Sequence, residues 1–200
     1  MKRFRFNNDS GKSLICWFVL LGGFLLGVLL PNIFWKTQIQ KGGFAGIYLM
    51  ETFTRAELAW EDYFLLLIKE RMTGIFLLMI CGVSVFGIPA ALFMSVWTGF
   101  FLGGVLTVSI LQFGAVGGVV GLGLFFPQYA LYLPVLFVLT SMAYSFSCKC
   151  WKNQKITAKE LRSYGGRCLL LIGIQTSGIA LECFLNPICV EFLINKLQIF

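Results

Sequence analysis

The middle of the sequence holds 77 consecutive residues, 72 to 148, without a single Asp, Glu, Lys or Arg. Because about 20 apolar residues suffice for a helix to cross the hydrocarbon core of a bilayer, this stretch has room for three crossings. The composition agrees, since 58% of the residues are hydrophobic and only 12% are charged, far from the mix that is typical of a soluble domain. We therefore expect the chain to fold within a membrane.

Two further apolar stretches flank this middle part, and each is long enough for one crossing. The first is too long for the apolar region of a signal peptide, so we expect it to remain as a span. The sequence thus predicts an all-α, polytopic helical bundle of about five transmembrane helices, with residues 1 to 200 forming a single membrane domain. The expected spans are 13–35, 72–94, 96–113, 125–147 and 168–187.

The basic residues predict how the chain is oriented, because Lys and Arg near span ends stay on the cytoplasmic side. They gather in the tail 1–12 and in the loop 149–167, where six of them occur with one acid, Glu160. Segment 36–71 instead balances five basic against five acidic residues. We predict a multi-pass protein of the cell membrane whose N-terminus and basic loop are cytoplasmic, and whose segment 36–71 and C-terminus are extracytoplasmic.

Segment 36–71 also carries apolar residues between its charges at spacings of three and four, which is typical of an amphipathic helix. It could be a connecting helix packed on the outer face of the bundle or a helix that binds a partner protein. Residues 188–200 could form a second, short helix along the outer interface. The candidate partner-binding residues are Glu57, Trp60, Glu61 and Asp62.

Glycine is concentrated in residues 99–123, where eight glycines occur. Gly99 and Gly103 form a G-x-x-x-G pair, which allows close contact between helices and gives weak support for a homodimer. Between Gly114 and Pro127, the glycine density and the proline argue against a continuous helix. We expect a broken or re-entrant segment inside the bundle there, with an ordinary outer loop as the alternative.

Residues that usually carry catalysis or hold metals are sparse. The sequence has no His, which is the commonest general base and zinc ligand, and it has no P-loop, Rossmann fingerprint or G-x-S-x-G. Cys148 and Cys150 lack a second nearby pair that would complete a zinc site. We therefore predict no enzymatic activity, no metal and no other cofactor. The excess of basic residues fits membrane topology and anionic lipid rather than nucleic acid.

Glu182 is an acidic residue well inside an expected span. An acid within the membrane is costly and is a functional candidate by default. One interpretation is structural: Glu182 reaches solvent or pairs with Gln112, Gln128 or Tyr129. The other places it on a transport path.

Several short motifs follow one another along the chain from residue 87 onward. A G-x-P comes first, then a G-x-x-x-G, a glycine-rich turn, a Pro-Gln element, a further proline and, in the last span, an E-x-x-x-x-P. They fall on Gly87, Pro89, Gly99, Gly103, Gly114, Gly117, Pro127, Gln128, Pro134, Glu182 and Pro187. This arrangement resembles the stage II sporulation protein M family, although Phe126 and Tyr129 stand where that family usually has Leu and Asn.

The resemblance implies a role in endospore formation at the engulfment stage. Proteins of that family act as non-enzymatic scaffolds for two partners that cut peptidoglycan, so that the septal wall is thinned. The implied partners are membrane lipid and the peptidoglycan hydrolases of the engulfment complex, and the implied location is the forespore septum. The alternative is a transporter or permease subunit working with a cytoplasmic ATPase, because a broken Gly-Pro helix and an intramembrane Glu suit a substrate path.

Overall fold

The computed structural model describes residues 10–34, 60–125, 128–152 and 156–197. In these ranges the chain forms helices and no strands, which confirms the predicted all-α bundle. The helices are α1 (Ser10–Phe34), α4 (Trp60–Gly82), α5 (Gly87–Phe125), α6 (Tyr129–Trp151) and α7 (Ala158–Leu197). Four of the five contain a stretch that is long and apolar enough to cross a membrane: Leu14–Ile33, Gly87–Leu111, Tyr129–Trp151 and Ala158–Leu185.

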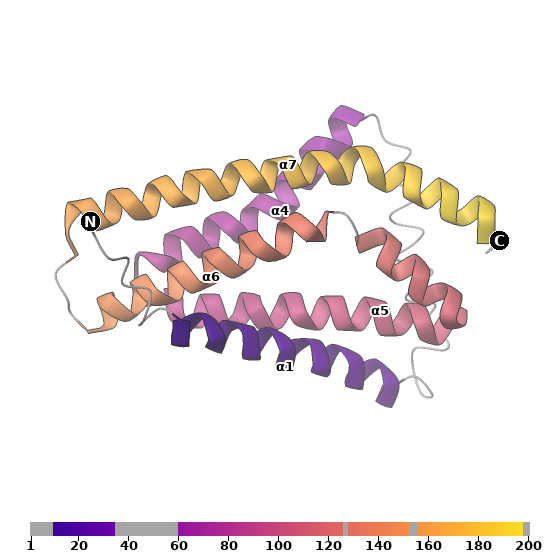
Figure 1. Ribbon diagram of the computed structural model, residues 1–200, viewed down its shortest axis with the longest axis horizontal. Helices are drawn as coiled ribbons and strands as arrows, with labels where there is room; N and C mark the ends of the chain where they lie inside the picture. Colours follow the sequence, from indigo (N-terminus) through magenta and orange to yellow (C-terminus); the bar gives the residue numbers. More distant parts are fainter. Residues whose placement is uncertain (1–9, 35–59, 126–127, 153–155, 198–200) are drawn as a thin grey trace.

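The helices run lengthwise between the two ends of an elongated bundle (Figure 1). α1 and α5 lie side by side along one edge, and α7 lies along the opposite edge. α4 contacts α5, α6 and α7. The start of α1 and the connection between α6 and α7 lie at one end of the bundle, whereas α7 finishes at the other end (Figure 1). The start of α1 at Ser10 therefore lies at the same end as the described basic residues that follow α6 and begin α7.

α4 corrects the expected span 72–94, which was wrong. The helix begins at Trp60, within the segment expected along the outer surface, and it ends at Gly82. It is packed into the bundle by buried side chains such as Tyr63 and Leu67. The three consecutive charges at Lys69, Glu70 and Arg71 distinguish it from the four apolar helices. Residues 36–59, including Glu57, lie outside the described residues.

A tight turn at residues 83–86 separates α4 from α5, and Ser147 on α6 holds it. The hydroxyl of Ser147 donates a hydrogen bond to the backbone oxygen of Val85 (3.0 Å) and accepts one from the N–H of Ile88 (3.1 Å). Ser147 thus ties the turn and the first residues of α5 to α6 without any charged residue. For this reason the uncharged stretch gave no sign that a helix ends there.

α5 is broken at Gly114, whose backbone has φ 65° and ψ −149°. After this residue the chain turns and runs back toward the start of α6 (Figure 1). The predicted break is therefore confirmed at its first glycine, and Pro127 lies outside the described residues. α7 continues as one helix to Leu197, so the separate short helix expected over residues 188–200 is not formed in the described part.

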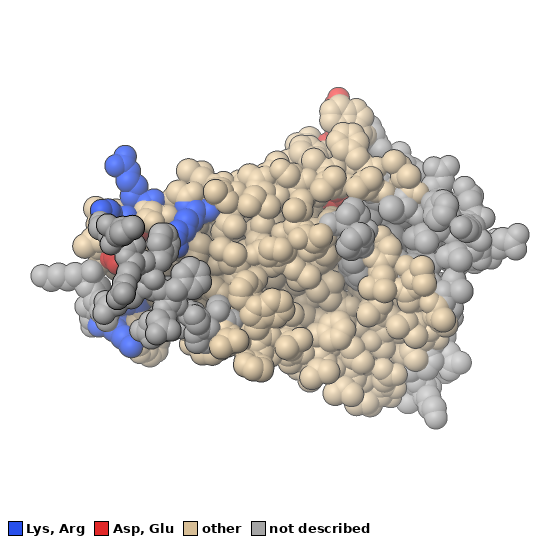
Figure 2. All heavy atoms as spheres, in the orientation of Figure 1, with Lys and Arg blue, Asp and Glu red and all other residues tan. Residues whose placement is uncertain are grey.

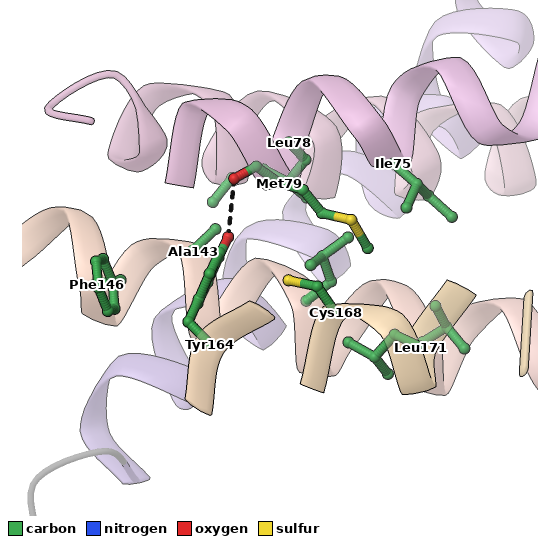
Figure 3. Packing of buried hydrophobic residues seen from close by; sticks show 11 residues of the cluster. Ile75, Leu78, Met79, Ala143, Phe146, Tyr164, Cys168 and Leu171 are labelled. Atoms are coloured by element: carbon green, nitrogen blue, oxygen red, sulfur yellow. Dashed lines mark hydrogen bonds between the residues drawn. The ribbon is translucent and has the colours of Figure 1, made fainter. Parts of the chain in front are cut away.

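Two groups of buried side chains form the core. The larger one joins α4, α6 and α7, with Ala91 of α5, and most of it is drawn in Figure 3. There the hydroxyl of Tyr164 donates to the backbone oxygen of Met79 at 3.1 Å. The smaller one lies farther along α7 and consists of Tyr63, Leu67, Met72, Tyr132, Ile179 and Cys183. Arg71 of α4 lies against this second group, over the ring of Tyr132.

Candidate functional site

A salt bridge joins α4 to α7 inside the bundle. Nη2 of Arg71 donates a hydrogen bond to Oε1 of Glu182 at 2.6 Å, and Nε of Arg71 donates to Oε2 at 3.2 Å. The Glu182 side chain is only 4% exposed, whereas that of Arg71 is 29% exposed. This two-point geometry is the strong form of an arginine–carboxylate pair and fixes the orientation of both side chains.

Tyr132 of α6 completes the arrangement, and we call Arg71, Tyr132 and Glu182 the ionic cluster. The hydroxyl of Tyr132 donates to Oε2 of Glu182 at 2.7 Å. The guanidinium carbon of Arg71 lies 5.6 Å from the centre of the Tyr132 ring, within the range of a cation–π contact. Tyr129 packs edge-on against Tyr132, with ring centres 5.7 Å apart. Three helices thus meet at one buried carboxylate.

The local structure around Tyr132 explains how it reaches Glu182. Gln128, which is 2% exposed, precedes α6, and its backbone oxygen accepts the N–H of Tyr132 at 3.0 Å. On α7, a Cβ atom added to Gly178 would lie 2.6 Å from Cε1 of Tyr132. Gly178 lies one helical turn before Glu182, and its missing side chain leaves the space that the Tyr132 ring fills. The first turn of α6 is in this way attached to the cluster.

The ionic cluster has the chemistry of a structural anchor. Both carboxylate oxygens of Glu182 accept hydrogen bonds, so the negative charge is compensated where it is buried. Removing one partner of such a pair leaves an uncompensated charge, which is strongly destabilising. The structural interpretation of Glu182 is thus supported, but its partners Arg71 and Tyr132 were not among those expected from the sequence.

The G-x-x-x-G pair of α5 packs against a matching pair on α1. A Cβ atom added to Gly99 or Gly103 would lie 2.2 Å or 2.4 Å from backbone oxygens of α1. Conversely, a Cβ on Gly23 or Gly27 would lie 2.4 Å or 2.2 Å from backbone oxygens of α5. The two backbones therefore touch, as small residues at this spacing allow. The motif that gave weak support for a homodimer makes its contact within the chain.

The G-x-P motif lies where α4 ends and α5 begins, away from the ionic cluster. Gly87 starts α5, and a Cβ there would lie 2.8 Å from Cβ of Ser147 and from Cα of Gly82. Pro89 falls in the first turn of α5, where backbone N–H groups have no partner within the helix, so its missing donor costs nothing. This motif therefore shapes the turn between α4 and α5.

The other motif residues lie in separate places. Gly114 forms the break, and Gly117 lies in the part of α5 beyond it. Pro134 lies within α6 and is exposed, and Pro187 lies within α7. The structure therefore brings Gln128 close to the ionic cluster around Glu182 but distributes the remaining motifs along the bundle.

The described candidates for partner binding are exposed at the start of α4. Trp60 is 62% exposed, and Glu61 and Asp62 are exposed beside it. The thiol of Cys183 lies 3.6 Å from the backbone oxygen of Trp60, so this turn lies beside the second half of α7. Acidic residues in the first turn also stabilise a helix through its dipole, which is an ordinary explanation for the two acids.

Sequence reasoning missed Arg71, Tyr132, Gly23 and Gly27. The two α1 glycines carried a usable signal, because their spacing equals that of Gly99 and Gly103. Arg71 and Tyr132 carried none, since only the folded bundle shows that they face one carboxylate.

The described residues hold no group of three or more His, Cys, Asp or Glu that could bind a metal ion. Of the two neighbouring cysteines, Cys150 directs its thiol to the backbone oxygen of Val83 at 3.4 Å. That contact packs α6 against the turn between α4 and α5.

A sequence model of the stage II sporulation protein M family matches residues 16–187. Neither curated proteins nor solved structures gave a match to this chain. The matched range contains the ionic cluster, both glycine pairs and the break at Gly114. A match of this length, to a sporulation-related family, agrees with the membrane bundle described above. The chain therefore belongs to the stage II sporulation protein M family.

Proposed function

We propose that this membrane protein is a non-enzymatic scaffold in endospore formation, which recruits or localises peptidoglycan-degrading partners at the septum for wall thinning and engulfment. Membership of a sporulation-related family supports a role in this process. The observation that carries the scaffold role is the exposed first turn of α4. It offers the exposed residues Trp60, Glu61 and Asp62 beside Cys183 of α7.

The position of this turn fits a partner on the wall side of the membrane. Trp60 lies beside Cys183, whereas Met79, near the other end of α4, accepts the hydrogen bond of Tyr164. α4 is therefore antiparallel to α7, and its first turn lies away from the basic connection between α6 and α7. Because basic residues stay cytoplasmic, the turn is expected to be extracytoplasmic. An exposed Trp is a common anchor of protein interfaces.

The ionic cluster supports the same proposal. A scaffold needs helices held in fixed positions, and Glu182 is used to join three of them. An acid engaged in this way serves rigidity rather than proton transfer.

The test is recovery of wall hydrolases from sporulating cells with the tagged full-length protein. We expect the charge reversals Glu61→Lys and Asp62→Lys, alone and combined, to reduce the amount of peptidoglycan hydrolase that co-purifies. Trp60→Ala should have the same effect. The matched control is Lys152→Glu, which reverses an exposed charge at the end of α6. Equal recovery with all variants, at equal membrane levels, would remove the support for this surface.

The second candidate is a transporter or permease subunit working with a cytoplasmic ATPase, and the broken α5 favours it. Irregular backbone and an intramembrane acid together are typical of substrate paths. If Glu182 served transport, Glu182→Gln would abolish a transport-linked phenotype even in protein that remains folded. Full activity of folded Glu182→Gln protein would exclude that use of Glu182.

A further inference from the structure

The first turns of α7 carry an exposed basic face. Lys159, Arg162 and Arg167 are exposed, whereas Tyr164 and Cys168, on the opposite side of the helix, are buried in the core. On the face that Figure 2 shows, the visible Lys and Arg side chains lie at this end of the bundle. The basic face thus points away from the other helices.

The charges of this face are not neutralised within the described part of the chain. Glu160 is the acid of this region, and its carboxylate already accepts a hydrogen bond from Nζ of Lys149 at 2.6 Å. No described acid forms an ion pair with Lys159, Arg162 or Arg167. The face therefore offers to a negatively charged partner three cations that no acid of the described ranges neutralises.

The same face becomes apolar one to two turns further along. Leu170 and Ile174 are 63% and 37% exposed, and they follow Lys159 at the spacing that keeps residues on one side of a helix. Gly166 and Gly173 lie on this side as well, and a Cβ added to either would meet nothing within 4 Å. Gly166 therefore leaves an open position between the cations and the apolar part of this face.

The change from basic to apolar occurs where the surface of the membrane is expected. Between Arg167 and Glu182 the helix has no charged residue, and residues 168–187 span about 30 Å, which is the thickness of the hydrocarbon core. Arg167 then lies at the boundary of that core, and Lys159 and Arg162 lie at the level of the lipid headgroups.

We propose that this face of α7 binds an anionic phospholipid. The phosphate lies over Gly166, flanked by Arg162 and Arg167, and an acyl chain follows Leu170 and Ile174. Guanidinium groups suit phosphate because they donate paired hydrogen bonds to its oxygens. A water-soluble anion or a cytoplasmic protein could bind the cations but would not contact Leu170 and Ile174, which lie within the membrane. This proposal does not depend on the scaffold function.

The test measures lipid binding to the purified full-length protein in detergent by native mass spectrometry. Dioleoyl-phosphatidylglycerol is compared with dioleoyl-phosphatidylcholine, which has the same chains without net charge, and with inorganic phosphate. We expect phosphatidylglycerol to bind more tightly than either. Arg162→Gln and Arg167→Gln should each weaken its binding about five-fold, the effect expected for one basic residue at a membrane surface. Gly166→Leu should also weaken it, because the added side chain occupies the open position between Arg162 and Arg167.

The control is Lys152→Gln, which removes an equally exposed cation of the same end that lies outside this face. We expect it to leave phosphatidylglycerol binding unchanged. If Lys152→Gln weakens binding as much as Arg162→Gln, and Gly166→Leu has no effect, the attraction is general and the proposed site is wrong. Equal binding of both lipids, or phosphate binding as tight as that of phosphatidylglycerol, would also overturn it.

Discussion

Arg71 and Glu182 lie 111 residues apart in the sequence, yet two hydrogen bonds of 2.6 Å and 3.2 Å join them in the middle of the fold. The pair lies in α4, which carries three consecutive charges, and in α7, whose apolar part is otherwise uncharged from residue 168 to 181. Arg71 and Glu182 thus neutralise each other's charge, which lowers the cost of burying either one among apolar neighbours.

Glu182→Gln should destabilise the protein through the unpaired guanidinium of Arg71. Loss of one partner of a buried pair costs about 3–5 kcal/mol, and the partial exposure of Arg71 places the effect at the lower end of that range. The measurement is thermal unfolding of the purified protein in detergent, with a clear decrease of Tm expected.

The matched experiment is the double variant Arg71→Met with Glu182→Leu. Because both charges are removed together, we expect it to regain most of the stability that either single change loses. Additive losses in the double variant would show that the two residues act independently.

Alanine at the glycine contacts between α1 and α5 should separate the two helices. Gly27→Ala and Gly99→Ala each place a Cβ 2.2 Å from a backbone oxygen of the facing helix, and overpacking of this kind costs about 1–3 kcal/mol. Thermal unfolding is again the measurement. Gly22→Ala is the control on α1, because a Cβ there meets nothing within 4 Å. If Gly22→Ala and Gly27→Ala lower the Tm equally, close backbone contact is not the cause.

Gly114→Ala should strain the break in α5. The backbone there, with φ 65° and ψ −149°, is open to glycine but costs other residues about 1–3 kcal/mol. We expect a lower Tm for this variant, although nothing lies within 4 Å of the added atom. Gly165→Ala, at an open helical position of α7, should instead be neutral or stabilising. An unchanged Tm for Gly114→Ala would mean that the break is not held in this conformation.

Reporter fusions should test the predicted orientation in the membrane. Alkaline phosphatase, which is active only outside the cytoplasm, should be active when fused after residue 60 and inactive when fused after residue 157. Green fluorescent protein, which folds in the cytoplasm, should give the opposite pattern. Phosphatase activity at residue 157 would place the basic connection on the wall side and would refute the predicted orientation.

The uncharged middle of the chain predicted the helical bundle well, because length and hydropathy decide whether a segment can cross a membrane. It predicted the end of α4 poorly. Ser147 holds the turn at residues 83–86 by hydrogen bonds to the backbone of Val85 and Ile88. Because the turn contains no charged residue, the hydropathy of the sequence does not reveal it. The break at Gly114 was predictable, because each glycine weakens the helix at its own position and the effect can be read from the local sequence.

The candidate site was only half predictable. Glu182 was identified because an acid in an apolar span is rare. Its partners come from α4 and α6, and the choice of Arg71 and Tyr132 depends on how three helices rotate and tilt against one another. Charge pattern alone assigned Arg71 to the surface, since it could not show that a carboxylate faces it.

The salt bridge between α4 and α7 joins two residues that the ribosome makes at different times. Ribosomes add about 5–20 residues per second, so Glu182 is made roughly 5–20 seconds after Arg71. During that interval the guanidinium of Arg71 has no counter-ion from α7, whereas α5 and α6, which also pack against α4, are already made. A chain truncated before Glu182 would therefore leave the guanidinium of Arg71 without its carboxylate partner inside the bundle.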